Sequence, residues 1–262
     1  MRAFDAVILE NAKLKPVILS MRVRVPQNIT AVPGQFANIY LDRPDMLLPR
    51  PISICGLEGD TMRLIYQIAG KGTQYLSELE RGKILRMVAP LGNGFNISGF
   101  SSNLADSRKA MLIGGGIGAP PLLFLAKMFK SPLAVLGFRS ASSIILADEF
   151  LSLGCETVVS TDDGSLGYKG RVMEVVRALA PERDISVIYA CGPRIMLGIA
   201  AEYARDKNIP CQVSMEEHMA CGIGACFCCP APVIENSRRV YKKVCKDGPV
   251  FDADSVAWEG LI

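Results

Sequence analysis

Residues 110–121 read AMLIGGGIGAPP, an apolar run followed by a glycine-rich turn and two prolines. The apolar run predicts a buried strand, and the residues after the prolines have the periodicity of a helix. A glycine turn between strand and helix lets the backbone approach a pyrophosphate, which the N–H groups of the helix N-terminus can bind. Tight packing alone would also explain the glycines, so the motif leaves both interpretations open. Its candidate dinucleotide-binding residues are Gly114, Gly115, Gly116 and Gly118.

The alternation of strand and helix continues after this turn. Such alternation predicts a doubly wound α/β domain with a parallel sheet, which we assign to residues 101–209. The evidence is a series of apolar runs, each followed by a helical period: residues 133–137 then 144–151, 157–161 then 172–178, and 187–190 then 195–204.

Further ligand-binding residues are expected where two later strands end, because the carboxyl ends of parallel strands share one edge of the sheet. The candidates there are Asp162, Cys191, Gly192 and Pro193. A simpler interpretation of Cys191 is a buried small residue that ends a strand. An acidic residue for a ribose 2′-hydroxyl would stand about 20 positions after the glycines, but the sequence has Arg139 in this region. The spacing therefore leaves NAD and NADP both open.

Residues 1–100 have a different pattern, in which short alternating runs are separated by turn residues. Two examples are the runs at residues 21–25, before Pro26, and 36–40, after a proline and a glycine. Alternation with a period of two predicts antiparallel strands in a barrel or sandwich. The polar segment 101–107 predicts a linker, which places a domain boundary there.

This β domain contains the sequence Arg50-Pro51-Ile52-Ser53. An arginine fork can bind a phosphate with two hydrogen bonds, and a serine hydroxyl can bond a flavin ring nitrogen. A motif this short also occurs by chance, so its weight depends on its place along the chain.

Four cysteines near the C-terminus have the spacing C-x4-C-x2-C…C, which is typical of a plant-type [2Fe–2S] cluster. They are Cys221, Cys226, Cys229 and Cys245, and the two-residue gap after Cys226 leaves Cys228 outside the set. Residues 210–262, which we treat as a separate module, are too few to bury a large core, so a metal cluster would stabilise them. The small residues between the first two cysteines would let the backbone direct N–H groups at the cluster sulfurs.

Three other interpretations of these cysteines can be compared with the cluster. A zinc site usually takes its ligands as two well-separated pairs, whereas three of these cysteines lie in one loop. A Rieske centre is excluded because it needs two histidines and the chain has only His218. Ordinary buried thiols would not explain why five of the nine cysteines fall within residues 221–245.

The composition excludes several classes of protein. The chain has 262 residues, enough for two domains and a small appendage. Its net charge is +3 with basic and acidic residues interspersed, which argues against nucleic-acid binding. The uncharged residues 110–126 approach the length of a membrane span, but glycines and prolines interrupt them. The N-terminal residues do not resemble a secretory signal, so we expect a cytoplasmic protein in which clustered cysteines bind metal.

The order of these motifs resembles that of the ferredoxin reductase superfamily: a β domain with Arg50–Ser53, a glycine-turn α/β domain, then a [2Fe–2S] module. The chain is similar, over essentially its full length, to the electron-transfer subunits of NAD-dependent (class 1B) dihydroorotate dehydrogenases. The most specific segments are PLGNGF at residues 90–95, MACGIGAC at 219–226 and VCKDGPVF at 244–251.

The resemblance implies binding sites for FAD and NAD in addition to the cluster. NAD would bind at the glycine turn and at residues 191–193, with Cys191 near the nicotinamide. Gln67 departs from the arginine often found at its position, which puts its phosphate contact in question. The residues that the resemblance assigns to FAD are Arg50, Pro51, Ile52, Ser53, Ile65, Tyr66, Gln67, Gly72 and Thr73.

The resemblance also implies a function and a partner. A separate FMN-containing subunit would oxidise dihydroorotate in pyrimidine (UMP) biosynthesis, and its electrons would pass through the cluster and FAD to NAD⁺. The expected assembly is a heterotetramer of two plus two subunits, and no catalytic acid or base is expected in this chain. One alternative is a flavin and iron–sulfur reductase subunit for ferredoxin, sulfide, hydrogenase or sulfite chemistry. Its transhydrogenase branch uses an aspartate as the first ligand, where this chain has Cys221. The other alternative is a zinc-stabilised protein without redox activity.

Overall fold

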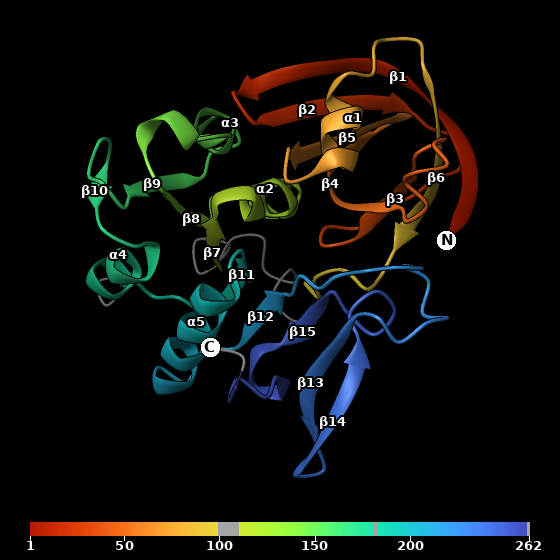
Figure 1. Cartoon of the computed structure of the whole chain (residues 1–262). Helices are drawn as coiled ribbons and strands as arrows, with labels where there is room; N and C mark the ends of the chain where they lie inside the picture. Colours follow the sequence, from red (N-terminus) through yellow and green to blue (C-terminus); the bar gives the residue numbers. More distant parts are fainter. Residues whose placement is uncertain (99–109, 181–182, 261–262) are drawn as a thin grey trace.

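The N-terminal part of the chain is a six-stranded antiparallel barrel, as the alternating sequence predicts (Figure 1). The computed structural model describes residues 1–98, 110–180 and 183–260. The barrel closes in the order β1-β2-β5-β4-β3-β6, and the short helix α1 (Lys71–Ser77) packs Leu76 into its core. The strands are β1 (Arg2–Lys15), β2 (Ile18–Arg24), β3 (Phe36–Tyr40), β4 (Arg50–Glu58), β5 (Thr61–Gln67) and β6 (Ile84–Leu91).

Strand β3 connects the barrel with the rest of the molecule. Its residues alternate in direction, so Ala37 and Ile39 lie in the barrel core while Phe36 belongs to a second buried cluster outside it. That second cluster includes Cys229 and Cys245 of the C-terminal segment. The outer face of β3 is therefore covered by the cysteine-rich part of the chain rather than by solvent.

The second domain is a seven-stranded sheet in the order β10-β9-β8-β7-β11-β12-β15. All neighbouring strands are parallel except β15, which runs antiparallel to β12. The predicted doubly wound sheet is thus confirmed. The strands are β7 (Ala110–Gly115), β8 (Leu133–Phe138), β9 (Glu156–Thr161), β10 (Tyr168–Lys169), β11 (Val187–Cys191), β12 (Cys211–Ser214) and β15 (Val250–Asp252).

Helices cover both faces of this sheet. Residues of α2 (Ala119–Ala126) and α3 (Ala147–Ser152) belong to one hydrophobic cluster, and those of α4 (Val172–Leu179) and α5 (Arg194–Asp206) to another. Strand β7 is buried throughout, as expected of a parallel strand with helices on both sides. The chain moves from β7 towards β8 on one side and later returns to β11 on the other. A topological switch point therefore lies between β7 and β11.

The C-terminal segment shares the sheet of the second domain and adds a hairpin. Strands β12 and β15 continue the sheet, whereas β13 (Pro230–Glu235) and β14 (Arg238–Lys243) form a separate two-stranded hairpin, at the bottom of Figure 1. The boundary between residues 209 and 210 stays a prediction, and the sheet extends across it. The predicted linker at residues 101–107 lies outside the described residues.

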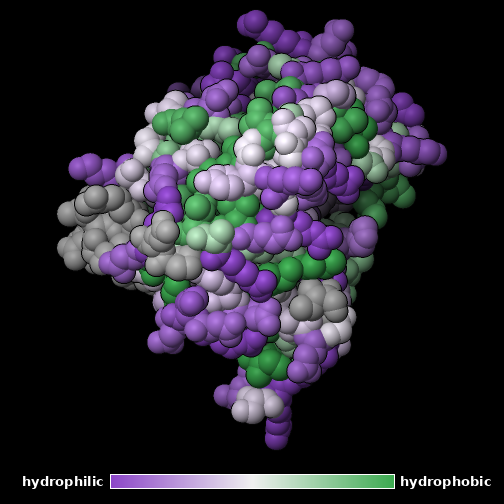
Figure 2. Space-filling model, turned by 90° about the vertical axis from the view of Figure 1, so that its left-hand side faces the viewer, coloured by the Kyte–Doolittle hydropathy of each residue, from purple (hydrophilic) through white to green (hydrophobic). Residues whose placement is uncertain are grey.

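The uncharged stretch at residues 110–126 is part of the protein core. It is divided among β7, a 3₁₀ turn (Gly116–Gly118) and α2, and all eight residues of α2 are buried. Among the described helices, none has the length and apolar character needed to cross a bilayer. Figure 2 shows the side of the molecule that lies on the left in Figure 1, where apolar residues form separate areas among polar ones.

Candidate functional site

A cavity of about 310 Å³ opens at the carboxyl ends of β7, β8, β9 and β11, beside the switch point. Four of the predicted nucleotide-binding residues line it: Gly115, Gly116, Asp162 and Pro193. Arg139 and Arg171 line it as well, and sequence reasoning did not assign either to the site. The two guanidinium groups and the glycine turn give this cavity the donors that a pyrophosphate requires.

The predicted glycines have two different roles. Side-chain atoms at Gly114 or Gly118 would collide with Leu136 and with the backbone of Cys191, so these two glycines permit close packing. Gly115 and Gly192 approach each other backbone to backbone, which joins the two turns at the switch point. Gly116 has a positive φ of 52° and open space where its Cβ would stand. Packing thus accounts for most of the motif, and Gly116 is free to face a ligand.

Cys191 ends β11 and is buried. Burial raises the pKa of its thiol, the Glu216 carboxylate acts in the same direction, and a hydrogen bond with Ser214 acts against both. The thiol is therefore protonated at neutral pH. It matches the simpler interpretation of a small buried residue, two positions before Pro193, which lines the 310 Å³ cavity.

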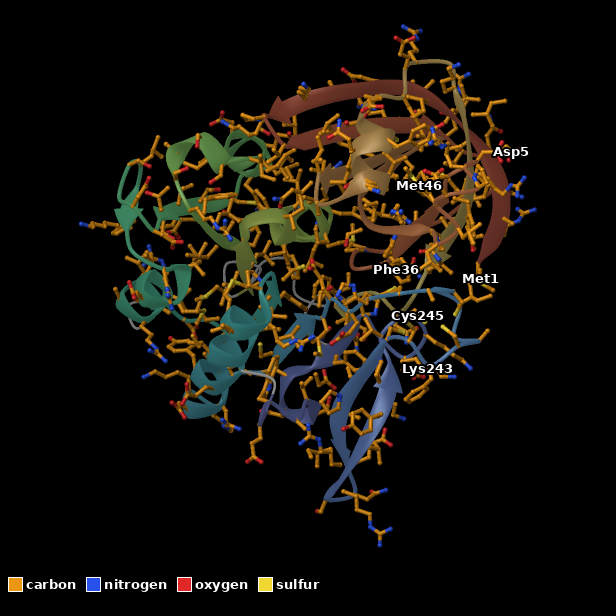
Figure 3. All side chains as sticks on the ribbon, viewed as in Figure 1. Met1, Asp5, Phe36, Met46, Lys243 and Cys245 are labelled. Carbon is orange, nitrogen blue, oxygen red and sulfur yellow. The ribbon has the colours of Figure 1, made fainter. Side chains whose placement is uncertain are left out.

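A second cleft, of about 460 Å³, lies between the loop that joins β3 to β4 and the segment after β12. Arg50 and Pro51 line one side together with Met46, and His218 and Met219 line the other. Figure 3 labels Met46 on this loop, above Phe36 and Cys245. The start of the predicted flavin motif thus faces the segment that leads into the cysteine loop.

The remaining predicted FAD residues divide into two groups. The Arg50 guanidinium lies where a side chain at Gly72 would stand, and it donates a hydrogen bond to the Leu48 carbonyl. The hydroxyl of Thr73 accepts hydrogen bonds from the backbone N–H groups of Ala69 (2.8 Å) and Gly70 (3.2 Å). These contacts bring Arg50, Gly72 and the turn before α1 together.

The other group lies on β4 and β5. The Tyr66 side chain is buried in the barrel core, where its hydroxyl donates to Asn11 Oδ1 at 3.0 Å. Ile65 is buried and Gln67 is exposed, whereas Ile52 and Ser53 are partly buried on β4. Tyr66 belongs to the barrel core and Ile65 to the buried cluster that includes α2, and neither side chain lines the 460 Å³ cleft.

The four predicted cluster ligands form two pairs of thiols. The Sγ atoms of Cys221 and Cys226 are 3.2 Å apart, and the thiols of Cys229 and Cys245 are both buried next to each other. Cys228 is exposed. Across residues 1–98, 110–180 and 183–260, no three His, Cys, Asp or Glu side chains converge as ligands of a single ion. Two pairs suit a [2Fe–2S] cluster, in which each iron takes two thiolates.

The backbone of this loop faces the sulfur atoms, as predicted from its small residues. Gly222 and Gly224 have positive φ values of 65° and 84°, which bend the chain around the ligands. Burial alone would raise the pKa of the Cys221 thiol, but N–H groups of the loop and the Cys226 thiol lower it to about 6. Burial and the adjacent Cys229 raise the pKa of Cys245 to about 12, against a hydrogen bond from the Gly224 N–H. Thiolate charge is therefore stabilised at Cys221 by N–H donors that would also face a cluster, whereas burial and Cys229 favour the neutral thiol at Cys245.

Two apolar side chains of this loop are exposed: Ile223 at 43 % and Phe227 at 57 %. Lys243 Nζ lies 5.6 Å from the centre of the Phe227 ring and donates to the Gly224 carbonyl at 2.8 Å. Figure 3 places Lys243 below Cys245, and it is the last residue of the hairpin strand β14. The cluster loop is thus buried on the barrel side and presents apolar groups on its outer side.

Comparison with known proteins agrees with this arrangement. Residues 216–257 match the family model "Iron-sulfur cluster binding domain of dihydroorotate dehydrogenase B". The chain is 45% identical over 231 residues to "Dihydroorotate dehydrogenase B (NAD(+)), electron transfer subunit" of Geobacillus kaustophilus, covering 86% of each chain. Its counterpart in Desulforamulus reducens is 36% identical, and the match covers 98% of this chain and 99% of that relative.

Solved structures support the same fold. A chain of the NADH-dependent reduced ferredoxin-NADP oxidoreductase has a TM-score of 0.84 and 29% identity, covering 98% of this chain and 91% of that one. A ferredoxin NADP+ reductase from Neisseria gonorrhoeae, solved with FAD and NADP, has a TM-score of 0.64 and 15% identity. The match covers 79% of this chain and 92% of the reductase chain, and at this low identity it is evidence for the fold alone. From the extent of identity to its curated relatives, the chain belongs to the family of electron transfer subunits of dihydroorotate dehydrogenase B (NAD(+)).

Proposed function

We propose that this chain accepts electrons from the FMN of a dihydroorotate-oxidising subunit and delivers them to NAD⁺ for pyrimidine biosynthesis. Its resident cofactors are FAD and a [2Fe–2S] cluster. The cluster supplies one-electron transfer, and the flavin supplies the exchange between single electrons and a hydride pair. The observation that supports this function most strongly is the position of the two cysteine pairs, beside the cleft that begins at Arg50 and Pro51.

Each part of the chain would contribute a binding surface. Cys221, Cys226, Cys229 and Cys245 would hold the cluster, and the N–H groups of their loop would stabilise its charge. Residues 50–53, the backbone of residues 65–67 and the turn at residues 72–73 would hold FAD. The cavity between Gly116 and Asp162 would hold NAD, with Cys191 beside it. Dihydroorotate itself would be oxidised on the partner, so this chain needs no acid or base for that step.

We propose that the partner docks on the outer side of the cluster loop, through Ile223 and Phe227. Exposed apolar side chains next to a redox site suit a protein interface, because burying them would also bring the partner close to the cluster. The proposed assembly is a heterotetramer of two catalytic and two electron-transfer subunits. We place it in the cytoplasm, where thiols stay reduced and available to bind iron.

One other function has a specific observation in its favour. The 29% identity to the oxidoreductase that links NADH, ferredoxin and NADP supports a reductase of similar layout with a different partner. The thiol at Cys221 and the higher identity to the dihydroorotate dehydrogenase relatives favour the function proposed above. Ferredoxin-dependent NADP⁺ reduction would distinguish the two.

Reconstitution tests the proposed function. The chain, purified anaerobically, should contain iron, acid-labile sulfide and FAD. Mixed with an FMN-containing dihydroorotate dehydrogenase subunit, it should give dihydroorotate-dependent reduction of NAD⁺, with formation of a complex that size-exclusion chromatography detects. A colourless chain that contains zinc but neither iron nor sulfide would contradict this function.

A further inference from the structure

Asn38 is a fully buried polar residue at the junction between the barrel and the cluster loop. It lies on β3, and its side chain points to the outer face of the barrel, between the inward-facing Ala37 and Ile39. Neither the flavin motif nor the cysteine motif includes it. A buried amide is expected to have partners for both its nitrogen and its oxygen, because an unpaired polar group costs free energy on burial.

The amide nitrogen of Asn38 has a partner in the cluster loop. Asn38 Nδ2 donates to the backbone carbonyl of Cys221 at 3.1 Å. The next residue, Gly222, provides the space for this contact, since a Cβ at Gly222 would collide with the Asn38 amide. The acceptor is a carbonyl oxygen, so it must face the nitrogen, which fixes the orientation of the amide.

The amide oxygen of Asn38 is buried and has no hydrogen-bond partner within the part of the chain that the structure describes. Because the nitrogen is held by Cys221, the oxygen cannot exchange places with it. The site therefore lacks one hydrogen-bond donor.

The register of the barrel places Asn38 beside the flavin motif. Asn38 lies directly opposite Pro51 on β4, and Phe36 lies opposite Ser53. Side chains of opposed residues in antiparallel strands point to the same face of the sheet. Asn38, Pro51 and Ser53 thus share the outer face of the barrel, and Pro51 lines the 460 Å³ cleft.

We propose that Asn38 is a positioning residue that links the flavin site to the cluster site. Its nitrogen holds the main chain of the first cluster ligand, and its oxygen accepts a hydrogen bond from the bound flavin, from the ring N3–H or a ribityl hydroxyl. This inference rests on the proposed function, because it requires both cofactors. In this proposal, the Asn38 side chain sets the position of Cys221 relative to FAD.

The test uses the full-length chain loaded with FAD and the cluster, with Asn38→Leu as the main variant. Leucine has a similar size and no polar atoms, so both hydrogen bonds are lost. The dissociation constant for FAD, from titration of the flavin-depleted chain, should rise by about three- to tenfold. The half-time of cluster loss to an iron chelator, followed by visible absorbance, should shorten by about tenfold, as is typical for residues that orient metal ligands.

A second variant distinguishes the role of the Asn38 amide oxygen from that of the amide nitrogen. Asn38→Asp keeps an acceptor oxygen and removes the N–H donor, so FAD affinity should stay within about threefold of the parent while cluster loss is accelerated. The opposite pattern would overturn the assignment of the two atoms. Ser160→Ala is the control, because Ser160 Oγ is another buried atom without a partner among the described residues, and it lies in the second domain. Its FAD affinity and cluster lifetime should match those of the parent.

The outcomes distinguish this proposal from the function on which it rests. If Asn38→Leu matches the parent in both FAD affinity and cluster lifetime, Asn38 does not position either group. If it changes cluster lifetime alone, the flavin contact is overturned. A parent chain that binds neither FAD nor a cluster would instead overturn the proposed function.

Discussion

Arg63 of the barrel forms a bidentate ion pair with Glu149 of the second domain. The Nη1 to Oε2 distance is 2.5 Å and the Nη2 to Oε1 distance is 2.9 Å. Arg63 also donates from Nε to Ser20 Oγ at 3.0 Å, which fixes the guanidinium plane. The pair lies between β5 and α3, so it connects the barrel to the second domain.

Glu149→Gln should therefore weaken the contact between the two domains. The pair is partly exposed, with 23 % of the Arg63 side chain and 43 % of the Glu149 side chain accessible, so we expect a loss of about 1 kcal/mol. For a chain of this size that lowers the melting temperature by about 2 to 4 °C, which calorimetry of the FAD-loaded chain can measure. Glu58→Gln is the control, since its ion pair with Lys127 also joins the domains but Glu58 is 69 % exposed. Equal losses in the two variants would argue against a special role for the bidentate pair.

A predicted cluster ligand and the exposed Cys228 should differ in their effect on the cluster. Cys245→Ala removes a buried thiol paired with Cys229, so the visible absorbance and the electron paramagnetic resonance signal of the cluster should be lost. Cys228→Ala should leave both signals intact, because Cys228 is exposed. Loss of the cluster in Cys228→Ala would show that the third ligand is assigned to the wrong residue.

Buried cysteines outside the cluster should resist alkylation over a wide pH range. Burial raises the pKa of Cys55 to about 12, of Cys155 to about 11 and of Cys211 to about 12. A thiol whose pKa is raised stays protonated below that pKa, and the protonated form is a poor nucleophile. Mass spectrometry after iodoacetamide treatment of the holoprotein should find Cys228 labelled and these three unlabelled from pH 7 to pH 9. Labelling of Cys55 at pH 8 would mean that the buried layer between the barrel and the second domain opens to solvent.

Asp162 should contribute to nucleotide binding, whereas its neighbour Asp163 should not. Asp162 lines the 310 Å³ cavity that we propose for NAD, and Asp163 instead accepts hydrogen bonds from the N–H (2.9 Å) and hydroxyl (2.5 Å) of Ser165. Asp162→Asn should raise the KM for NAD⁺ by about tenfold, because hydrogen bonds to a charged acceptor are stronger than those to an amide. Asp163→Asn should change the KM by less than about twofold. Equal effects of the two substitutions would place the nucleotide elsewhere.

The proposed partner surface predicts an effect of Phe227 on complex formation. Phe227→Ser should weaken binding of the catalytic subunit by at least about tenfold in a titration, because burying a large aromatic side chain supplies much of the energy at an interface. Leu151→Ser is the matched control, since Leu151 on α3 is 55 % exposed and lies on the other domain. Similar losses in both variants would point to a general change in the surface rather than to this interface.

The fold could be predicted in most of its parts because the main elements have strong local patterns. The apolar run at residues 110–113 and the alternation at residues 36–40 identify β7 and β3 within two residues. Helix α1 was missed because its seven residues are too few for a helical period. Strand β15 was missed because it has three residues and pairs with β12, which lies 36 or more residues away in the chain.

The candidate site was predictable where spacing alone fixes chemistry, as in the four cysteines. The candidate site was less predictable where the burial of a side chain determines whether it can contact a ligand. The resemblance that assigned Tyr66 to FAD could not indicate that its side chain points into the barrel, because the direction of each strand face depends on the register. Arg171 and Asn38 were missed for a similar reason. Each lies near the site through contacts between distant segments, such as the 183-residue separation between Asn38 and Cys221.

The most direct test of the central claim is the rate of dihydroorotate-dependent NAD⁺ reduction by the assembled complex with Cys226→Ala. The Cys226 thiol is paired with Cys221, so its removal should prevent cluster formation while the FAD site in the barrel stays intact. We predict that the variant retains FAD and reduction of that FAD by NADH, but loses dihydroorotate-dependent NAD⁺ reduction. If the variant reduces NAD⁺ at the normal rate with dihydroorotate, electrons do not pass through the cysteine loop and the account is contradicted.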